Sequence, residues 1–207
     1  MSDERIEIRQ ERPEEYLATE NLVREAFWNV YRPGCLEHYV LHTFRSRPEF
    51  CAELDLLLLR EGEAIGQVMF VRNTLRGASA EVPVLTLGPI CIHPAWQRRG
   101  YGKLLLDRSL ALAAATDAAG VFLEGNIGFY GKSGFVVAST LGIRYMDEPA
   151  DDPVPYFLCK PLRPEALRGL DARYRVPQGY FVDEASAEAY DRQFPPKERL
   201  RLPGQLV

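Results

Sequence analysis

Several features that mark large protein classes are absent from this chain of 207 residues. Its four cysteines, at positions 35, 51, 91 and 159, include no C-x-x-C pair, so they do not suggest a disulfide framework and suit a reducing compartment. The longest apolar runs, such as Leu56 to Leu59, are far shorter than a membrane span of about 20 residues. The polar N-terminus lacks the apolar stretch of a secretory signal. We therefore expect a cytoplasmic protein that does not contact a membrane.

An excess of positive charge is also lacking. The chain has 25 Lys and Arg against 29 Asp and Glu, a net charge of −4. The first 20 residues hold seven acids and three bases, so they carry the whole excess, and the remaining residues hold 22 of each sign. This balance argues against a protein that clamps nucleic acid over its surface. Because the acidity belongs to the N-terminus, it says little about any ligand site.

The hydrophobic pattern predicts an α/β chain of the α+β type. Alternating or short apolar runs predict strands, and longer periodic segments predict helices. The strands are expected over residues 5–9, 54–59, 64–71, 82–92, 121–123, 135–145 and 156–162, and the helices from Pro13 to about Val30 and over 36–44, 104–115, 127–133 and 183–192. This order predicts a mixed, mostly antiparallel central sheet flanked by helices. The strand, helix and strand around residues 85–124 form a crossover that makes one pair parallel.

Two details refine this picture. Gly88-Pro89 interrupts the predicted strand over 82–92, which indicates a bulge or a break in its hydrogen-bonded ladder. The helix over 104–115 is rich in Leu and Ala and nearly apolar all round, so we expect it to be buried on all sides.

One segment combines glycine and positive charge immediately before a predicted helix. We call Gln97 to Lys103 the basic loop; it holds two glycines and three cations, Arg98, Arg99 and Lys103. Unpaired N–H groups at a helix start carry partial positive charge, and glycine lets a phosphate approach the backbone, so the loop suits a pyrophosphate. The spacing fails both the G-x-x-x-x-G-K-[ST] and the G-x-G-x-x-G patterns. A basic loop with no ligand is the alternative.

The surrounding pattern resembles the acetyl-CoA-binding motif of the GNAT superfamily of N-acetyltransferases. Its loop, Q/R-x-x-G-x-G/A, matches Gln97 to Gly102, and its strand pattern, apolar-x-apolar-x-Pro, matches Ile90, Ile92 and Pro94. A second family motif, Tyr-x-x-x-Gly-Phe, matches Tyr130 to Phe135. The resemblance covers about residues 5–162. We therefore expect a GNAT-like domain over 1–162, with a splayed parallel strand pair, and a C-terminal extension over 163–207 packed on or beside it.

The resemblance implies a set of residues that bind the cosubstrate acetyl-CoA. Main-chain groups of the strand before the basic loop would hold the pantetheine arm, and N–H groups of the loop would hold the pyrophosphate. In this sequence the implied residues are Ile90, Cys91, Ile92, Gln97, Arg98, Arg99, Gly100, Tyr101, Gly102, Lys103 and Asn126. Asn126 lies only four residues before Tyr130, a shorter spacing than in many relatives, so a helix-capping role is the alternative.

The resemblance also implies direct transfer of the acetyl group to a bound amine. Tyr130 matches the tyrosine that protonates the departing thiolate, although a packing role beside Phe129 and Phe135 is the alternative. The base is open: Glu124 follows a predicted strand, but a solvated or ion-paired carboxylate, His93 and a water chain are other interpretations.

Cys35, His38 and His42 share one face of a predicted helix. A zinc site is the least favoured interpretation, and we predict no metal. A partly buried face is the simplest one, and a third is that this helix borders the acceptor site, with Glu37 and Tyr39 contributing.

The leading hypothesis is an acetyl-CoA-dependent N-acetyltransferase acting on a small-molecule or protein amine, with no nucleic-acid partner. The alternative is a non-catalytic acyl-CoA-binding regulatory module, and a phosphate-binding protein of another fold ranks third. The sequence leaves a homodimer open and does not identify the acceptor.

Overall fold

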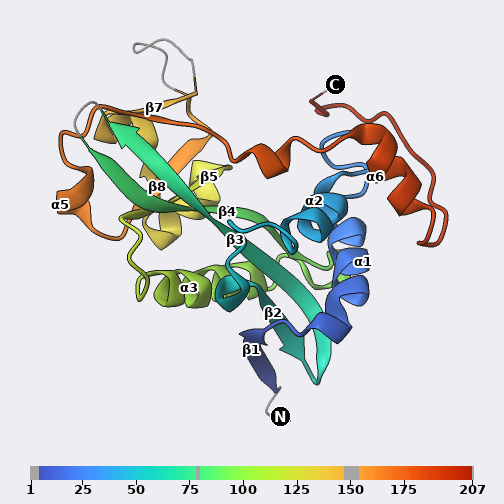
Figure 1. Ribbon diagram of the computed structural model, residues 1–207. Helices are drawn as coiled ribbons and strands as arrows, with labels where there is room; N and C mark the ends of the chain where they lie inside the picture. Colours follow the sequence, from blue (N-terminus) through green and yellow to red (C-terminus); the bar gives the residue numbers. More distant parts are fainter. Residues whose placement is uncertain (1–4, 78–79, 147–153, 207) are drawn as a thin grey trace. The chain divides into compact units, whose positions relative to one another are not determined.

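The computed structural model describes residues 5–77, 80–146 and 154–206, and the chain divides into two compact units. Unit 1 comprises Met1–Met69, Pro89–Leu105 and Gln178–Val207, and unit 2 comprises Phe70–Gly88 and Leu106–Pro177. Two strands and one helix contribute residues to both units, and each unit is described by itself. Figure 1 labels the helices and strands.

Unit 1 contains the N-terminal strands and helices together with the last helix of the chain. Helix α2 packs against α1 and also contacts α6 (Figure 1). The elements lying wholly in this unit are β1 (Ile6–Gln10), α1 (Tyr16–Phe27), α2 (Glu37–Phe44), β2 (Leu56–Arg60) and α6 (Glu184–Asp191), with 3-10 helices η1 (Pro13–Glu15), η2 (Ala52–Leu54), η3 (Pro94–Trp96) and η6 (Gln178–Tyr180). The elements that contribute to both units are β3 (Glu63–Gly77), β4 (Glu81–Ile92) and α3 (Tyr101–Ala113).

Unit 2 is built from short strands around an aromatic core. Phe122, Phe157 and Tyr174 stack on one another, with ring centroids 4.8–5.6 Å apart. The elements lying wholly in this unit are β5 (Gly120–Glu124), α4 (Ile127–Tyr130), β6 (Val136–Val137), β7 (Ile143–Tyr145), β8 (Phe157–Pro161), α5 (Pro164–Leu167) and β9 (Ala172–Tyr174), with 3-10 helices η4 (Gly131–Ser133) and η5 (Ala138–Leu141).

The sheet is mixed and mostly antiparallel, which confirms the predicted fold class. Its hydrogen-bonded order is β1-β2-β3-β4-β5-β8-β6, and β9 pairs with β3 and β7. The β4–β5 pair is parallel, as the strand–helix–strand pattern predicted. Strand β9, which the sequence pattern missed, adds a second parallel pair with β7.

The parallel pair is short. Its register joins Leu85 to Val121 and Thr86 to Phe122, whereas β5 pairs with β8 along all of Gly120 to Glu124. Strand β4 continues through Gly88-Pro89, and Gly88 takes a φ of 150°, which glycine adopts far more readily than other residues. The bulge or ladder break expected at Gly88-Pro89 stays a prediction, although the positive φ of Gly88 departs from regular strand geometry.

The β2–β3 hairpin has a two-residue turn in which both residues have positive φ. Glu61 has a φ of 50° and Gly62 a φ of 87°. This geometry matches the right-handed twist of the strands and is the one that a residue followed by glycine favours. The strands expected over residues 54–59 and 64–71 are therefore joined as a tight hairpin.

Three predicted elements differ in the structure. Residues 135–145 do not form one strand, because η5 and Gly142, with a φ of 74°, separate β6 from β7. Helix α1 ends at Phe27, and Asn29 takes a φ of 60°. Helix α3 is not buried on all sides: one face, including Leu105, Leu106 and Leu110, is buried, whereas Leu104 is 45% exposed. Leu and Ala are strong helix formers, so their abundance there reflects helix propensity as well as burial.

Residues 163–206 contribute secondary structure to both units. In unit 2, β9 pairs with β3 and β7. In unit 1, α6 begins after Asp183, whose side chain caps it by accepting from the Ser186 N–H at 2.7 Å. The division into a domain over 1–162 and an extension over 163–207 stays a prediction. Among the described residues, no helix is both long enough and apolar enough to cross a membrane.

Candidate active site

In unit 1, the basic loop follows β4 through a short, well-connected turn. The His93 N–H donates to Ile65 O at 2.8 Å, and the Gln97 amide Nε2 donates to Ile92 O at 3.0 Å. His93 Nδ1 accepts from the Ala95 N–H at 3.2 Å and so caps η3. His93 therefore has a local structural role, and Gln97 fastens the start of the basic loop to the end of the strand.

The basic loop contains two left-handed residues immediately before helix α3. Arg98 has a φ of 60° and Gly100 a φ of 91°. A Cβ placed on Gly100 would meet no atom within 4 Å, so the space over this glycine is open. The Gly100 carbonyl accepts the Leu104 N–H at 3.1 Å and starts the helix. The loop thus exposes backbone at the positive end of a helix, where an anion is favoured.

Two of the three cations of the basic loop, Arg98 and Arg99, have no acidic partner among the described residues. Within the described residues, neither Arg98 nor Arg99 forms an ion pair, and the N–H groups of Arg98, Arg99, Gly100 and Gly102 donate to no protein atom. Unused donors and uncompensated guanidinium groups at an open glycine are what an anionic group needs. The residues present therefore fit the pyrophosphate of coenzyme A.

The strand before the basic loop is largely buried. Cys91 is 7% exposed and Ile92 6%, while Ile90 is half-buried. Burial raises the pKa of the Cys91 thiol to about 12, so this thiol is protonated at neutral pH. A protonated thiol is a poor nucleophile, and Cys91 is therefore unsuited to carrying an acyl group during catalysis.

In unit 2, Glu124 stands at the end of β5 with an exposed side chain. Its Oε1 accepts a hydrogen bond from the Tyr145 hydroxyl at 2.6 Å. Burial and then this hydrogen bond to the carboxylate raise the pKa of Tyr145, which stays a donor at neutral pH. Tyr145 was not found by sequence reasoning, and it holds the Glu124 carboxylate in a defined position.

Asn126 and Tyr130 belong to the short helix α4 of unit 2. Asn126 Oδ1 accepts from the Gly128 N–H at 2.7 Å, which confirms the capping alternative; its contact with the cofactor stays a prediction. The Tyr130 ring meets Phe129 and Phe135 edge-on, with centroids 4.9 and 5.6 Å away. The ring also covers Gly125 so closely that a Cβ there would overlap it. The ring packing is therefore real, and the acid role of the hydroxyl stays a prediction.

Cys35, His38 and His42 do not share one helix face as predicted, because α2 begins at Glu37 and only the two histidines lie on it. The three side chains belong to unit 1 and to two separate clusters. Cys35 Sγ lies 3.3 Å from His38 Nδ1, and His38 Nε2 lies 3.2 Å from Asp191 Oδ1 on α6. Burial lowers the pKa of His38 to about 4 and raises that of the Cys35 thiol, so both groups are neutral at neutral pH. This row of thiol, imidazole and carboxylate is therefore packed and unreactive.

Asp191 attaches the C-terminal segment to the rest of unit 1. The buried Arg24 of α1 donates to it through Nε at 2.6 Å and Nη2 at 3.1 Å.

Residues described in the structure contain no group of three or more metal-ligating side chains placed to hold an ion. Glu37, also predicted near an acceptor, accepts from the Leu36 N–H at 2.9 Å, and burial raises its pKa.

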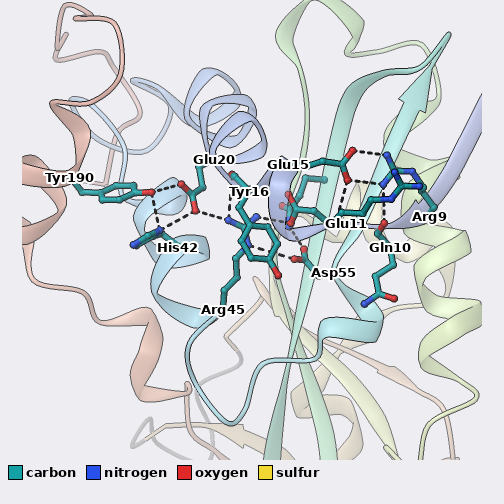
Figure 2. A network of polar contacts seen from close by, with 12 residues as sticks. Arg9, Gln10, Glu11, Glu15, Tyr16, Glu20, His42, Arg45, Asp55 and Tyr190 are labelled. Carbon is teal, nitrogen blue, oxygen red and sulfur yellow. Dashed lines mark hydrogen bonds and ion pairs between the residues drawn. The ribbon is translucent and has the colours of Figure 1, made fainter.

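A second polar cluster of unit 1 surrounds Arg45 (Figure 2). The Arg45 side chain is 5% exposed and bonds Glu11 at 2.6 Å and Glu20 at 2.5 Å, while its Nε lies 3.7 Å from Asp55. Gln67 donates to Asp55 at 3.0 Å. One guanidinium thus faces three buried carboxyl groups, which makes it the principal source of positive charge for all of them.

The cluster reaches the surface through Glu20. His42 Nδ1 lies 3.1 Å from Glu20 Oε1 and 2.8 Å from the Tyr190 hydroxyl, and that hydroxyl also bonds Glu20 (Figure 2). The Tyr39 ring stacks beside His42 at 6.0 Å and contacts Tyr190 at 5.3 Å. His42 and Tyr39 therefore share a face with the C-terminal helix, and a role in acceptor binding stays a prediction.

We predict that Asp55→Asn flattens the pH dependence of stability. Burial, and then the neighbouring Glu11, raise the pKa of Asp55 to about 8, above the ordinary value of about 3.9 for an unfolded chain. Between these values the folded state binds the extra proton, so the free energy of unfolding should fall as the pH rises from 4 to 8. Urea unfolding at pH 5 and pH 8 should show a smaller difference for Asp55→Asn. A difference equal to that of the wild type would contradict the assigned protonation.

The pairings that sequence reasoning missed join residues far apart in the chain. Glu124 meets Tyr145, Arg24 meets Asp191, and Arg45 meets Glu11. A spacing pattern within a short stretch of sequence does not predict pairs between residues so far apart.

Comparison with known proteins agrees with this geometry. The family described as the acetyltransferase (GNAT) family matches residues 12–135, which is more than half of the chain. The chain therefore belongs to the GNAT family of acetyltransferases. The match includes the basic loop, Glu124, Asn126 and Tyr130.

One similar protein is the uncharacterized N-acetyltransferase YjhQ of Escherichia coli. The two are 29% identical over 82 residues, which make up 40% of this chain and 45% of that protein. The chain therefore spans less than half the length of this relative. The GNAT protein YhbS of Escherichia coli, solved with CoA, aligns with a TM-score of 0.70 at 20% identity, covering 84% of this chain and 92% of that one. An acetyltransferase of Brucella melitensis, solved with acetyl-CoA, aligns with a TM-score of 0.59 at 24% identity over 76% and 88% of the two chains. These structures support the fold.

Proposed function

We propose that this protein is an acetyl-CoA-dependent N-acetyltransferase that moves an acetyl group to a primary amine by direct attack. The observation that carries the proposal is the basic loop of a GNAT-family chain: an open, left-handed Gly100, amides without protein partners, and Arg98 and Arg99 without acidic partners. Acetyl-CoA, which the similar structure from Brucella melitensis contains, would be the cosubstrate, with its pyrophosphate on the loop and its pantetheine arm along Ile90 to Ile92.

The chemistry requires a base and an acid from this chain. The neutral amine forms the new C–N bond, the C–S bond breaks, and the electron pair leaves on sulfur. A base must accept the proton of the amine, and we assign this to Glu124, whose carboxylate is exposed and held by Tyr145 at 2.6 Å. Tyr130 would supply the proton to the departing thiolate. The protonated Cys91 gives no reason to invoke an acyl-enzyme.

A thiol-release assay with acetyl-CoA tests the proposal directly. Purified protein would be offered a panel of primary amines, including polyamines, aminoglycosides, amino acids and peptides with a free N-terminus. We expect amine-dependent thiol release and a matching acetylated product by mass spectrometry. Tight acetyl-CoA binding without release across the panel would instead favour the regulatory acyl-CoA-binding module.

Tyr130→Phe is expected to lower kcat about tenfold or more with little change in acetyl-CoA affinity. The phenyl ring keeps the edge-on contacts with Phe129 and Phe135, so only the proton donor is lost. Steady-state kinetics and calorimetric binding measure the two quantities separately. The matched control is Tyr156→Phe, a tyrosine of the same unit that is 48% exposed and should keep wild-type turnover. Full turnover by Tyr130→Phe would refute the acid role.

A further inference from the structure

In unit 2, strand β5 ends at a carboxylate that a single tyrosine holds. Glu124 Oε1 accepts from the Tyr145 hydroxyl at 2.6 Å, and among the described residues this carboxylate has no other partner. Within that part of the chain no cation neutralises Glu124, so its second oxygen is available to accept a proton. The carboxylate is therefore fixed only as firmly as Tyr145 itself is fixed.

The Tyr145 ring is packed among three other aromatic rings of the same unit. Its centroid lies 4.8 Å from that of Phe157 and 6.2 Å from those of Tyr156 and Tyr174. The Tyr174 ring is nearly parallel to it, with an angle of 18° between the two planes. Because an enclosed ring has few rotamers available, the Tyr145 hydroxyl keeps one direction.

Strand β9 fixes the backbone that carries this ring. It pairs with β7 in parallel, and the register joins Tyr145 to Tyr174. The Met146 N–H, directly after Tyr145, donates to Tyr174 O at 2.7 Å. An ion pair of 2.6 Å between Arg144 and Asp171 joins the residues that precede the two tyrosines. Tyr145 is therefore placed by a strand that comes later in the chain.

Tyr174 is in turn tied to the strand pair that carries Glu124. Its hydroxyl lies 2.7 Å from Thr86 Oγ1, and both residues are buried. Thr86 pairs with Phe122 of β5, two residues before Glu124. The Tyr174 ring also stacks on Phe122, with centroids 5.1 Å apart. Strand β9 thus reaches β5 by two routes, one through Tyr145 to Glu124 and one through Thr86 and Phe122.

We infer that strand β9 completes the active site: Tyr174 supports Tyr145, and Tyr145 positions the Glu124 carboxylate that accepts the proton of the amine. The inference rests on the proposed function, which assigns the base to Glu124. Both tyrosines lie beyond residue 135, where the match to the family ends. As the C–N bond forms, one proton passes from the nitrogen to Glu124. Tyr145 and Tyr174 are positioning residues and keep their own protons.

A double-mutant cycle tests whether Tyr145 acts through Glu124. The assay uses acetyl-CoA and the amine of the panel that gives the fastest thiol release. We expect Tyr145→Phe to lower kcat about tenfold and to leave the KM for acetyl-CoA within about twofold, because only the hydroxyl that orients the base is lost. Glu124→Gln should lower kcat about 100-fold. In the Glu124→Gln background, Tyr145→Phe should change kcat by less than about twofold, since residues that act as one unit are not additive.

Tyr174→Phe tests the support from β9. It keeps the ring stacks and removes the hydroxyl that meets Thr86. We expect kcat to fall about threefold, the scale of one lost neutral hydrogen bond, with no further loss in the Glu124→Gln background. Thermal melting would confirm that each variant is folded at the assay temperature.

Leu167→Ala is the matched control for a loss of stability alone. Leu167 is buried in unit 2, and its side chain packs over Gly120, at the end of β5 opposite to Glu124. The truncation should lower the melting temperature more than either tyrosine variant does, because it leaves a cavity. Its kcat, measured where the variant is folded, should stay near that of the wild type.

The outcomes separate the inference from the proposed function. Full turnover by Tyr145→Phe or by Tyr174→Phe would overturn the inference and leave the proposed acetyl transfer standing. Losses that multiply in the double variants would do the same, because the tyrosines would then act independently of Glu124. Full turnover by Glu124→Gln would overturn both the assigned base and the inference. Wild-type protein that releases no thiol with any amine of the panel would refute the proposed function and, with it, the inference.

Discussion

Gly100→Asp is expected to weaken acetyl-CoA binding by about 100-fold or more, which corresponds to about 2.7 kcal/mol. Two effects act together. Gly100 has a φ of 91°, and a residue with a Cβ is strained there by about 1–2 kcal/mol. The new carboxylate would also occupy the open space over the loop and face the pyrophosphate; a charge pair about 5 Å apart costs about 3 kcal/mol at an effective dielectric constant of about 20. Calorimetric titration with acetyl-CoA measures the loss.

Gly62→Asp is a closely matched control. Gly62 has a φ of 87°, and a Cβ there also meets no atom within 4 Å, so the substitution brings the same charge into the same backbone conformation in the β2–β3 turn. It should reduce stability about as much as Gly100→Asp while leaving acetyl-CoA affinity near wild type. Gly100→Asn adds a neutral side chain and should lie between the two in affinity. If Gly100→Asp binds acetyl-CoA as tightly as Gly62→Asp, the basic loop does not hold the pyrophosphate.

Arg45→Met is expected to lower the free energy of unfolding by about 3–5 kcal/mol, the usual cost of removing one partner from a buried ion pair. The guanidinium bonds Glu11 and Glu20 and lies near Asp55 (Figure 2), so its loss leaves three buried carboxyl groups without a cation. Methionine has a similar length and keeps most of the packing. Urea unfolding followed by circular dichroism measures the change.

Arg47→Met provides the comparison for this second prediction. Its side chain is 39% exposed beside Glu49, and pairs near the surface contribute about 1 kcal/mol or less. Adding Glu11→Gln to Arg45→Met should recover part of the lost stability, because it removes one of the stranded charges. A loss for Arg45→Met no larger than that for Arg47→Met would show that the cluster is hydrated in solution.

The elements that were predicted well are those whose signals are local. The strands expected over residues 54–59 and 64–71, the helix expected over 183–192 and the loop that begins α3 each depend on residues within a few positions of one another. The tail strand β9 was missed because its three residues have little pattern of their own and are held by pairing with β3 and β7. The prediction of one strand over residues 135–145 was wrong. Apolar residues there belong to two short strands and to the turn around Gly142 that separates them, so the apolar pattern alone did not show the break.

In the candidate site, too, features with a local signal were predicted and pairs between distant residues were missed. The basic loop was found because its cations and glycines are adjacent in the chain, and Asn126 was weighed as a cap because it directly precedes its helix. Tyr145 beside Glu124 and Arg24 beside Asp191 were not found, since 21 residues separate the first pair and 167 the second.

The sequence by itself determined the family, the mixed sheet with its parallel crossover, and the location of the basic loop. These depend on short-range rules of turn, cap and periodicity that operate within a few residues. Only the tertiary structure decided which charges have partners of opposite sign. Arg45 lies beside three buried carboxyl groups and Arg24 pairs with Asp191. Arg99 pairs with no carboxylate among the described residues. Compensation depends on distance and burial, which folding creates between residues that the sequence holds far apart.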